Sequence, residues 1–325
     1  MYDNQDGLIC AMLADADGGA EALDWDGIDK WRPGQGLLWV HFDYTAEQTE
    51  HWLREASGLA PVVADALLMR ETRPRCVVHG GELLMSLRGV NMNPAQAGEE
   101  MVAIRLWSDG QRVISTRHRR LRSVDRIRED YAEGRGPTDA ADLAQALSHY
   151  LHNFAGEAIE DLEDRLDALE ADALEGSGDE LRQKLLHLRR EVILLRRYLA
   201  PQRDALNRLW QERLAWMDDT HRVQLREVAD IAMRQVEDLD ALRDRGTVLY
   251  EELGARLADQ MNRRMYVLSL IAGLFLPLGF VTGLLGINVG GMPGAENPLG
   301  FVVVVLLLVA LGLLQWRYFR TRGWV

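Results

Sequence analysis

Two long apolar runs lie at the C-terminal end of the 325-residue chain. Tyr266 to Gly286 and Leu299 to Trp316 contain no charged residue, and each is close to the roughly 20 residues that a helix needs to cross a bilayer. We therefore predict transmembrane helices at 266–286 and 299–316, joined by a loop of residues 287–297. A buried helix of a soluble core is the alternative for any single apolar run, but two runs joined by a short loop favour the membrane.

The first 137 residues alternate between strand-like and helix-like patterns. Three stretches are rich in Val, Ile, Leu and aromatic residues: 36–44, 75–90 and 101–117. The second and third are broken at His79-Gly80-Gly81 and at Ser108-Asp109-Gly110, which are typical of hairpin turns. Thr45 to Gly58 begins with a Thr-x-x-Gln cap and ends with glycine, as a helix does. Residues 1–137 are therefore predicted to form a cytoplasmic α/β domain.

Residues 138–219 change to a helical pattern, with Thr138 as the expected N-cap. Apolar residues recur at three- and four-residue steps in two arms: Ile159, Leu162, Leu166, Leu169 and Ala173, then Leu181, Leu185, Leu188, Val192, Leu195 and Leu199. A Gly176-Ser177-Gly178 turn separates the arms, and Pro201 is expected to end the second one. The spacing predicts an antiparallel helical hairpin followed by a connecting helix.

The helical pattern continues over residues 220–265, the predicted stalk, and enters the first apolar run without a turn signal. A helix of about 65 residues, at about 1.5 Å per residue, is roughly 100 Å long. The predicted fold class is α+β/α membrane protein: an N-terminal α/β domain, a long helical stalk and two C-terminal transmembrane helices. A continuous stalk could carry a cytoplasmic signal directly to the membrane segment.

Basic residues flank the two apolar runs. Arg263 and Arg264 precede the first run, the tail 317–325 follows the second with three arginines, and the loop contains neither Lys nor Arg. Because positively charged flanks stay on the cytoplasmic side, both termini are predicted to be cytoplasmic. The N-terminus has no basic segment followed by an apolar stretch, so we expect no signal peptide.

Composition and charge narrow the function further. The net charge of −13 disfavours a nucleic-acid partner and suits cations. Cys10 and Cys76 are too few for a disulfide framework and lack the paired spacing of a structural zinc site, which favours two buried thiols. The sequence has no P-loop, nucleophile elbow or HExxH pattern. We therefore expect neither an enzyme nor a bound cofactor.

The first arm of the hairpin is strongly acidic. Nine carboxylates between Glu157 and Glu175 face a single base, Arg165, so this segment alone has a charge of −8. Two interpretations remain open at this stage. The arm can be a solvated helix face balanced by the arginine-rich second arm, or it can concentrate or sense divalent cations near the cytoplasmic mouth of a pore.

The first apolar run has one face of mostly small residues. They lie at three- and four-residue spacing and are Met265, Ser269, Ala272, Leu276, Gly279, Gly283 and Gly286. Such a face can pack membrane helices together, and in an oligomer it can also line an aqueous pore. Just beyond it, Asn288 offers a neutral amide to the water shell of a cation, and Glu296 adds one negative charge at the outer entrance.

Other residues are candidates for metal binding or proton coupling. His149 and His152 stand at helical i, i+3 spacing with Asp142 two turns earlier, a geometry that can bind zinc, although two surface histidines are the alternative. Glu251 and Asp259 on the stalk can ring the inner pore, or can form ion pairs with Arg256 or Arg263. Neither apolar run contains His, Cys, Asp or Glu, so any coupling residue must lie outside them.

These residues together resemble a known family, the CorA superfamily of divalent-metal transporters. The matching segments are Leu276-Pro277-Leu278, Thr282-Gly283, Gly286-Ile287-Asn288 and the basic tail. With Gly290-Gly291-Met292-Pro293-Gly294 following it, the Gly-Ile-Asn variant of the Gly-Met-Asn motif is similar to the zinc-transporter branch, ZntB. Ile287 replaces the usual Met, and Leu285 stands where many members have Tyr, so magnesium selectivity is not carried over.

The resemblance implies a homopentameric funnel in the bacterial inner membrane, with the first membrane helix lining the pore and Asn288 in its outer ring. It also implies zinc transport coupled to protons in symport, with uptake as the expected direction. The implied partners are Zn²⁺, other divalent cations, protons, lipid and further copies of the chain.

Two alternatives to zinc transport remain. A magnesium, cobalt or nickel channel of the same superfamily would share every feature above, and only flux measurements separate the two. A membrane-anchored coiled-coil protein without a pore is the other alternative. Proteins of that class usually place a folded sensor between their two membrane helices. The loop 287–297 is too short to contain one.

Overall fold

The computed structural model describes residues 6–91, 101–175, 179–287 and 297–324. The chain divides into two compact units, Met1–Tyr250 and Glu251–Val325, which we call the first and second units. The strands are β1 (Leu8–Ala14), β2 (Ala20–Ala22), β3 (Leu37–Asp43), β4 (Arg75–His79), β5 (Glu82–Val90), β6 (Met101–Ser108) and β7 (Arg112–Arg117). The helices are α1 (Trp25–Lys30), α2 (Glu47–His51), the π-helix η1 (Trp52–Ala56), α3 (Pro61–Leu68), α4 (Arg122–Ala132), α5 (Ala140–Glu175), α6 (Asp179–Gln211), α7 (Asp219–Leu285) and α8 (Gly300–Thr321).

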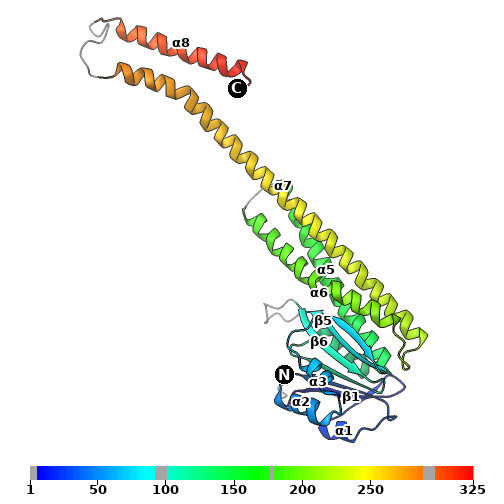
Figure 1. Cartoon of the computed structure of the whole chain (residues 1–325). Coiled ribbons are helices and arrows are strands. Elements are labelled where there is room, and N and C mark those ends of the chain that lie inside the picture. The colour runs from blue at the N-terminus through cyan, green and yellow to red at the C-terminus, as the bar shows by residue number, and fades with distance from the viewer. Residues whose placement is uncertain (1–5, 92–100, 176–178, 288–296, 325) are drawn as a thin grey trace. The chain divides into compact units, whose positions relative to one another are not determined.

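The first unit is built on a seven-stranded sheet in the order β2-β1-β3-β7-β6-β5-β4 (Figure 1). Only β3 and β7 pair in parallel, and the other neighbours are antiparallel. Both predicted hairpin turns are confirmed. Gly80, Gly81 and Gly110 have φ angles of +60°, +87° and +91°, which glycine adopts without steric strain. The predicted helix after β3 is a short α2 continued by η1.

The sheet is buried on both faces. Along β3, Leu38, Val40 and Phe42 point to a core shared with the α1–α3 side, while Leu37 and Trp39 point to a core shared with α4 and α5. This alternation follows from the two-residue period of a strand. A half-exposed strand alternates apolar and polar residues, whereas a strand buried on both faces needs apolar residues at nearly every position. Burial on both faces therefore explains the near-continuous apolar sequence of β3.

Helices α5 and α6 form the predicted hairpin, and α7 packs beside it (Figure 1). The leucines at heptad-like spacing are buried: Leu162, Leu166 and Leu169 of α5, Leu185, Leu188, Leu195 and Leu199 of α6, and Leu239, Leu242 and Leu249 of α7. The prediction that Pro201 ends the second arm was wrong, because α6 continues to Gln211. Proline removes one hydrogen bond of the helix, but burial of Leu199, Ala205 and Leu206 around it holds the helix together.

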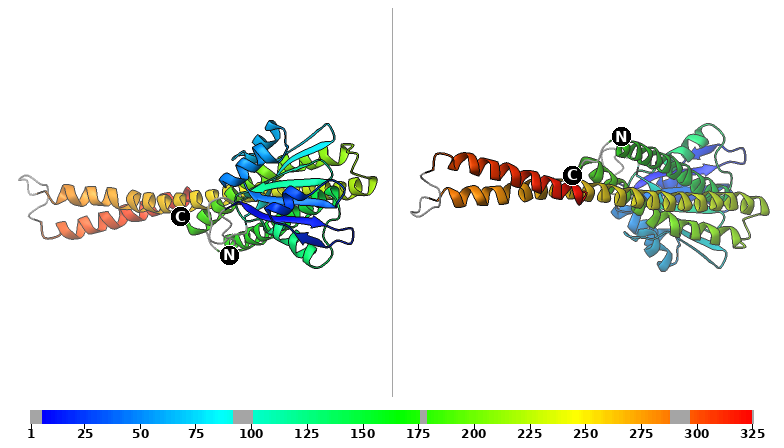
Figure 2. Two further views of the ribbon diagram at one scale, coloured as in Figure 1. Left: turned by 90° about the horizontal axis from the view of Figure 1, so that it is seen from below. Right: turned by 90° about the horizontal axis from the view of Figure 1, so that it is seen from above.

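The second unit contains the C-terminal part of α7 and all of α8, which lie antiparallel side by side (Figure 2). Helix α7 continues through Pro277, and α8 extends beyond Trp316 to Thr321. The two helices meet closely at Gly273, where an added Cβ would lie 3.3 Å from the Phe319 ring. Tyr266 also donates a hydrogen bond to the backbone oxygen of Trp324.

Candidate transport site

The two helices of the second unit are long and apolar enough to cross a membrane. In both, the most apolar 18-residue window has 0% of its residues buried within the chain. Phe275, Phe301 and Leu306, for example, are exposed. An apolar surface of this extent is not stable in water, so lipid or other copies of the chain must cover it.

The contact between α7 and α8 uses one stripe on each helix. The half-buried positions recur at helical spacing, with Leu270, Leu274, Leu278 and Val281 on α7 and Val304, Leu308, Leu311, Gln315 and Phe319 on α8. The predicted small-residue face lies elsewhere on α7. All of its members are exposed: Met265, Ser269, Ala272, Leu276, Gly279, Gly283 and Gly286. An added Cβ at Gly279 or Gly283 would meet nothing within 4 Å.

Gly286 and Ile287 follow the end of α7. The Gly286 N–H donates to the carbonyl oxygens of Thr282 and Gly283 at 2.9 and 3.2 Å, which closes the last turn of the helix. Ile287 is exposed. The predicted entrance residues Asn288 and Glu296 lie outside the described residues. Their roles remain predictions.

The acidic stalk candidates are both exposed. Glu251 and Asp259 lie on α7, in the second unit. Arg256, one of the bases expected to pair with them, forms an ion pair with Glu252. Among the described residues no ion pair of Glu251 or Asp259 is found. Their carboxylates therefore remain available to cations or to other copies of the chain.

The structure does not bring His149 and His152 together as metal ligands. His152 is fully buried, and its Nδ1 lies 2.6 Å from Oε1 of Gln235, while its Nε2 lies 3.2 Å from Nε2 of Gln202. Burial lowers the pKa of His152 to about 4, so it is neutral at pH 7. With both ring nitrogens engaged, His152 joins α5 to α6 and α7.

Gln202 also forms hydrogen bonds with the backbone of strand β5. Its Oε1 accepts a hydrogen bond from the Arg88 N–H at 2.7 Å, and its Nε2 donates to the Arg88 carbonyl at 3.1 Å. His149, by contrast, is half-buried, and its Nε2 lies 3.0 Å from Nδ2 of Asn153. The two histidines are one turn apart but have different surroundings.

Asp142, the third residue of that expected site, belongs to another cluster. It lies with Asp139 and His221, and one potential ligand atom from each falls within 4.8 Å of the others. The His221 Nε2 is 3.3 Å from Asp139 and 3.4 Å from Asp142, and its Nδ1 is 2.8 Å from Asp218. Asp139 also caps α5 by accepting the N–H groups of Ala141 and Asp142. The cluster is thus already used to join the starts of α5 and α7.

Part of the acidic arm of α5 forms ion pairs with an arginine of α7. Arg245 of α7 reaches Asp167 at 2.5 Å and Glu170 at 2.8 Å. Arg165 instead pairs with Glu191 of α6 at 2.7 Å. Within the described residues, the arm supplies no group of three ligand atoms close enough to share a metal ion. The structure favours the solvated-face interpretation, but the expected balance by the second arm is not found among the described residues: the arginines that pair with the arm from outside are Arg245 of α7 and Arg122 of α4.

One polar residue of the membrane helices was not singled out from the sequence. Gln315 lies on the α8 stripe that faces α7, and its Oε1 is buried without a hydrogen-bond partner among the described residues. It is the one polar side chain in the run Leu299–Trp316. A single amide in an apolar run could have been recognised from the sequence as a candidate for an interaction between helices, because an unpaired amide in hydrocarbon is costly.

An α/β domain, a long helix and two apolar C-terminal helices define a membrane protein of the CorA type. Residues 34–321 match the family described as CorA-like Mg²⁺ transporter protein. The chain therefore belongs to this family.

Named relatives cover nearly the whole chain. It is 42% identical over 291 residues to the divalent cation transporter CmaX of Pseudomonas aeruginosa, covering 89% of this chain and 87% of that protein. It is 36% identical over 317 residues to the zinc transport protein ZntB of Yersinia pseudotuberculosis, covering 98% and 96%. The structure of full-length CmaX superposes with a TM-score of 0.86 at 39% identity, covering 99% of each chain.

Proposed function

We propose that this protein transports divalent cations across the bacterial inner membrane as a homopentamer, with zinc as the cargo and protons in symport. Uptake is the proposed direction, and both termini are proposed to be cytoplasmic. Membership of the CorA-like family supports transport. The names of two relatives, a divalent cation transporter and a zinc transport protein, support the choice of cargo.

The observation that carries this proposal is the exposed small-residue face of α7. Two helices cannot enclose an aqueous path, so a pore requires several copies of the chain. Helix α8 covers the opposite side of α7, along Leu270, Leu274 and Leu278. The face containing Ser269, Ala272, Gly279 and Gly283 is therefore left for neighbouring copies. Small side chains let helices approach closely around a common axis.

The side chains of this face determine how an ion would pass. The runs Tyr266–Gly286 and Leu299–Trp316 contain no His, Cys, Asp or Glu, so they cannot replace the water shell of zinc with strong ligands. We propose that the ion passes largely hydrated, with the Asn288 amides hydrogen-bonding its water shell at the entrance. Weak binding of this kind permits the ion to leave as well as to enter. Glu296 outside and Glu251 and Asp259 inside would attract cations electrostatically.

Zinc influx into proteoliposomes with a trapped zinc-sensitive dye tests the proposal. We expect influx by the wild-type protein to rise when an inward proton gradient is imposed. Asn288→Ala should lower the flux by about tenfold or more, because it removes the amide ring while leaving the apolar contacts intact. Native mass spectrometry of the variant checks that the oligomer is unchanged. Glu296→Gln is the matched loop variant. It should lower the zinc flux less, and this loss of flux should become smaller at high salt, because salt screens the charge of Glu296.

The other outcomes identify the alternatives. Zinc flux unaffected by the proton gradient would overturn the coupling. Flux of magnesium, cobalt or nickel without zinc would place the protein among channels for those ions. An absence of flux for every ion would favour a membrane-anchored protein without a pore. Unchanged flux in Asn288→Ala would remove Asn288 as the entrance ligand.

A further inference from the structure

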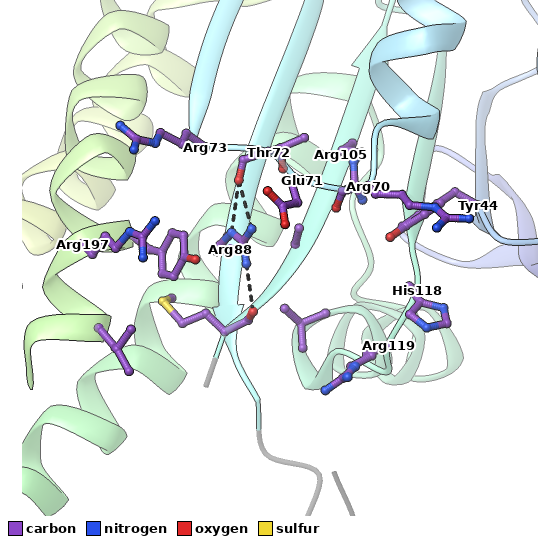
Figure 3. A pocket seen from close by; sticks show the side chains of 15 residues that line it. Tyr44, Arg70, Glu71, Thr72, Arg73, Arg88, Arg105, His118, Arg119 and Arg197 are labelled. Atoms are coloured by element: carbon purple, nitrogen blue, oxygen red, sulfur yellow. Dashed lines mark hydrogen bonds between the residues drawn. The ribbon is translucent and has the colours of Figure 1, made fainter. Parts of the chain in front are cut away.

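The first unit contains a cavity of about 670 Å³ between the sheet and α6 (Figure 3). Its walls come from the segment between α3 and β4, strands β5 and β6, the residues after β7, and α6. Six arginines line it: Arg70, Arg73, Arg88, Arg105, Arg119 and Arg197. Among the described residues of the lining, Glu71 is the only carboxylate. The volume is typical of small-molecule sites.

This concentration of positive charge contrasts with the rest of the protein, whose net charge is −13. Arg88 is fixed by its own surroundings. Its guanidinium donates to the backbone oxygens of Thr72 at 3.0 Å and Met101 at 3.1 Å, and it stacks on the Tyr198 ring at 4.2 Å. In the part of the chain that the structure describes, neither Arg88 nor Arg105 forms an ion pair with a carboxylate. The positive charge of Arg88 is held in place but not neutralised by these contacts.

Arg105 gives a second and independent observation. Only 1% of it is exposed, yet its Nε and Nη1 have no hydrogen-bond partner among the described residues. Its Nη2 donates to the Arg70 carbonyl at 3.0 Å, and its guanidinium stacks on the Tyr44 ring at 4.5 Å. Burial lowers its pKa, but an arginine remains charged at neutral pH.

Thr72 adds an unpaired hydroxyl to the same wall. Its Oγ1 is buried and has no partner within the described ranges. Buried donors left unpaired are rare, because each one loses its hydrogen bonds to water without replacing them, and a charged donor loses more. These buried groups do not reach the cavity themselves, so a bound anion would act on Arg105 through its charge, and would accept hydrogen bonds from the exposed lining arginines Arg73 and Arg197.

Phosphate fits this set of donors best. Guanidinium groups bind its oxygens through paired, forked hydrogen bonds, and several arginines can surround one phosphate group. The cavity is larger than inorganic phosphate needs, and a divalent cation would be repelled. We propose that the cavity binds a soluble phosphate-bearing small molecule, with Arg88 as a fixed donor, Arg105 as a fixed buried charge, and Arg73 and Arg197 as exposed donors at the rim.

Calorimetric titration of the purified full chain in a neutral detergent tests this site. Four probes are compared at constant ionic strength: inorganic phosphate, pyrophosphate, ATP and glycerol phosphate, the last standing for a lipid headgroup. EDTA is present throughout, so that a transported cation cannot bridge the probe to the protein. We expect pyrophosphate or ATP to bind at least about tenfold more tightly than inorganic phosphate or glycerol phosphate, because they offer more oxygens to the arginines.

Variants of the exposed arginines avoid the risk of unfolding. Arg73→Ala/Arg197→Ala should weaken binding by about tenfold or more, whereas Arg190→Ala, an exposed arginine of α6 outside the lining, should change it by less than about twofold. Glu99→Gln/Glu100→Gln, which neutralises the two carboxylates next to the lining residue Met101 in the sequence, is titrated as well.

Two results would overturn the inference. One is an absence of heat with all four probes at millimolar concentration, in the wild type and in Glu99→Gln/Glu100→Gln. The other is binding that the double arginine variant leaves unchanged. Tighter binding of glycerol phosphate than of pyrophosphate would overturn the soluble ligand in favour of a lipid headgroup. Because calorimetry needs no flux, these outcomes are independent of the zinc measurements.

Discussion

The two units of this chain differ in how their apolar side chains are buried. In the first unit, the leucines of α5, α6 and α7 face one another, and the sheet is covered on both sides. In the second unit, α7 and α8 share one narrow stripe and leave Phe275, Phe301 and Leu306 exposed. The first unit can therefore close its core within one chain. The second unit needs lipid or further copies to cover its apolar surface, as helices that cross a membrane do.

The rate of thiol labelling should show the largest difference between the two units. Burial raises the pKa of both native cysteines, Cys10 and Cys76, to about 12, so neither should react with a water-soluble reagent in the folded protein. Ser269→Cys on the small-residue face should react at least about tenfold faster than Phe275→Cys, which is exposed outside that face, because in the proposed pore only the former would meet water. Labelling is measured by mass spectrometry in proteoliposomes.

The controls for labelling lie in the same helix. Leu274→Cys, on the stripe covered by α8, should stay as unreactive as the wild type. Labelling of Phe275→Cys as fast as Ser269→Cys would show that the face of α7 has been assigned wrongly. Strong labelling of the wild type would contradict the buried state of Cys10 and Cys76.

Truncating one leucine in each unit should give the next largest difference. Leu188→Ala removes a buried side chain of α6 and should lower the free energy of unfolding of the first unit by about 2–5 kcal/mol. Leu306→Ala makes the same chemical change on the exposed surface of α8 and should leave that transition within about 0.5 kcal/mol of wild type. Urea unfolding of the full chain in detergent measures both. Equal losses would refute the division into a closed and an open unit.

The smallest expected effect concerns acid stability. His152 is neutral in the folded protein, with a pKa lowered from 6.5 to about 4 by burial, so its contribution is fully present above pH 6.5 and is lost as the pH falls toward 4. The loss should be on the order of 3 kcal/mol. His152→Gln should flatten this part of the stability curve, even if it lowers stability at pH 7.5. Urea midpoints from pH 7.5 to 4 test it, and identical slopes would contradict it.

The sequence was most informative where the determining contacts are local. Gly80-Gly81 and Gly110 predicted both turns because positive φ is a property of single residues. The two apolar helices could be predicted from the length and composition of their sequences alone. Pro201 was misread because its effect on a helix can be outweighed by packing with distant residues, which no local pattern reveals.

The candidate sites depended more on contacts between distant parts of the chain. The i, i+3 spacing placed His149 and His152 near each other, but burial of His152 depends on Gln202 and Gln235, 50 and 83 residues away. Asp142 meets His221 for the same reason. The arginine-lined cavity was missed because each of its arginines looks ordinary in its own strand, helix or loop. Only the fold brings them together.

The hydrogen bonds between Gln202 and Arg88 have a consequence for the solubility of the protein. Strand β4 pairs with β5 only as far as Ser86, so the next outward-facing backbone groups, those of Arg88, would form an open sheet edge. The Gln202 amide occupies both of them, as a neighbouring strand would. At the other edge, β2 is only three residues long. At Arg88, therefore, a strand of another copy finds no free backbone groups to pair with.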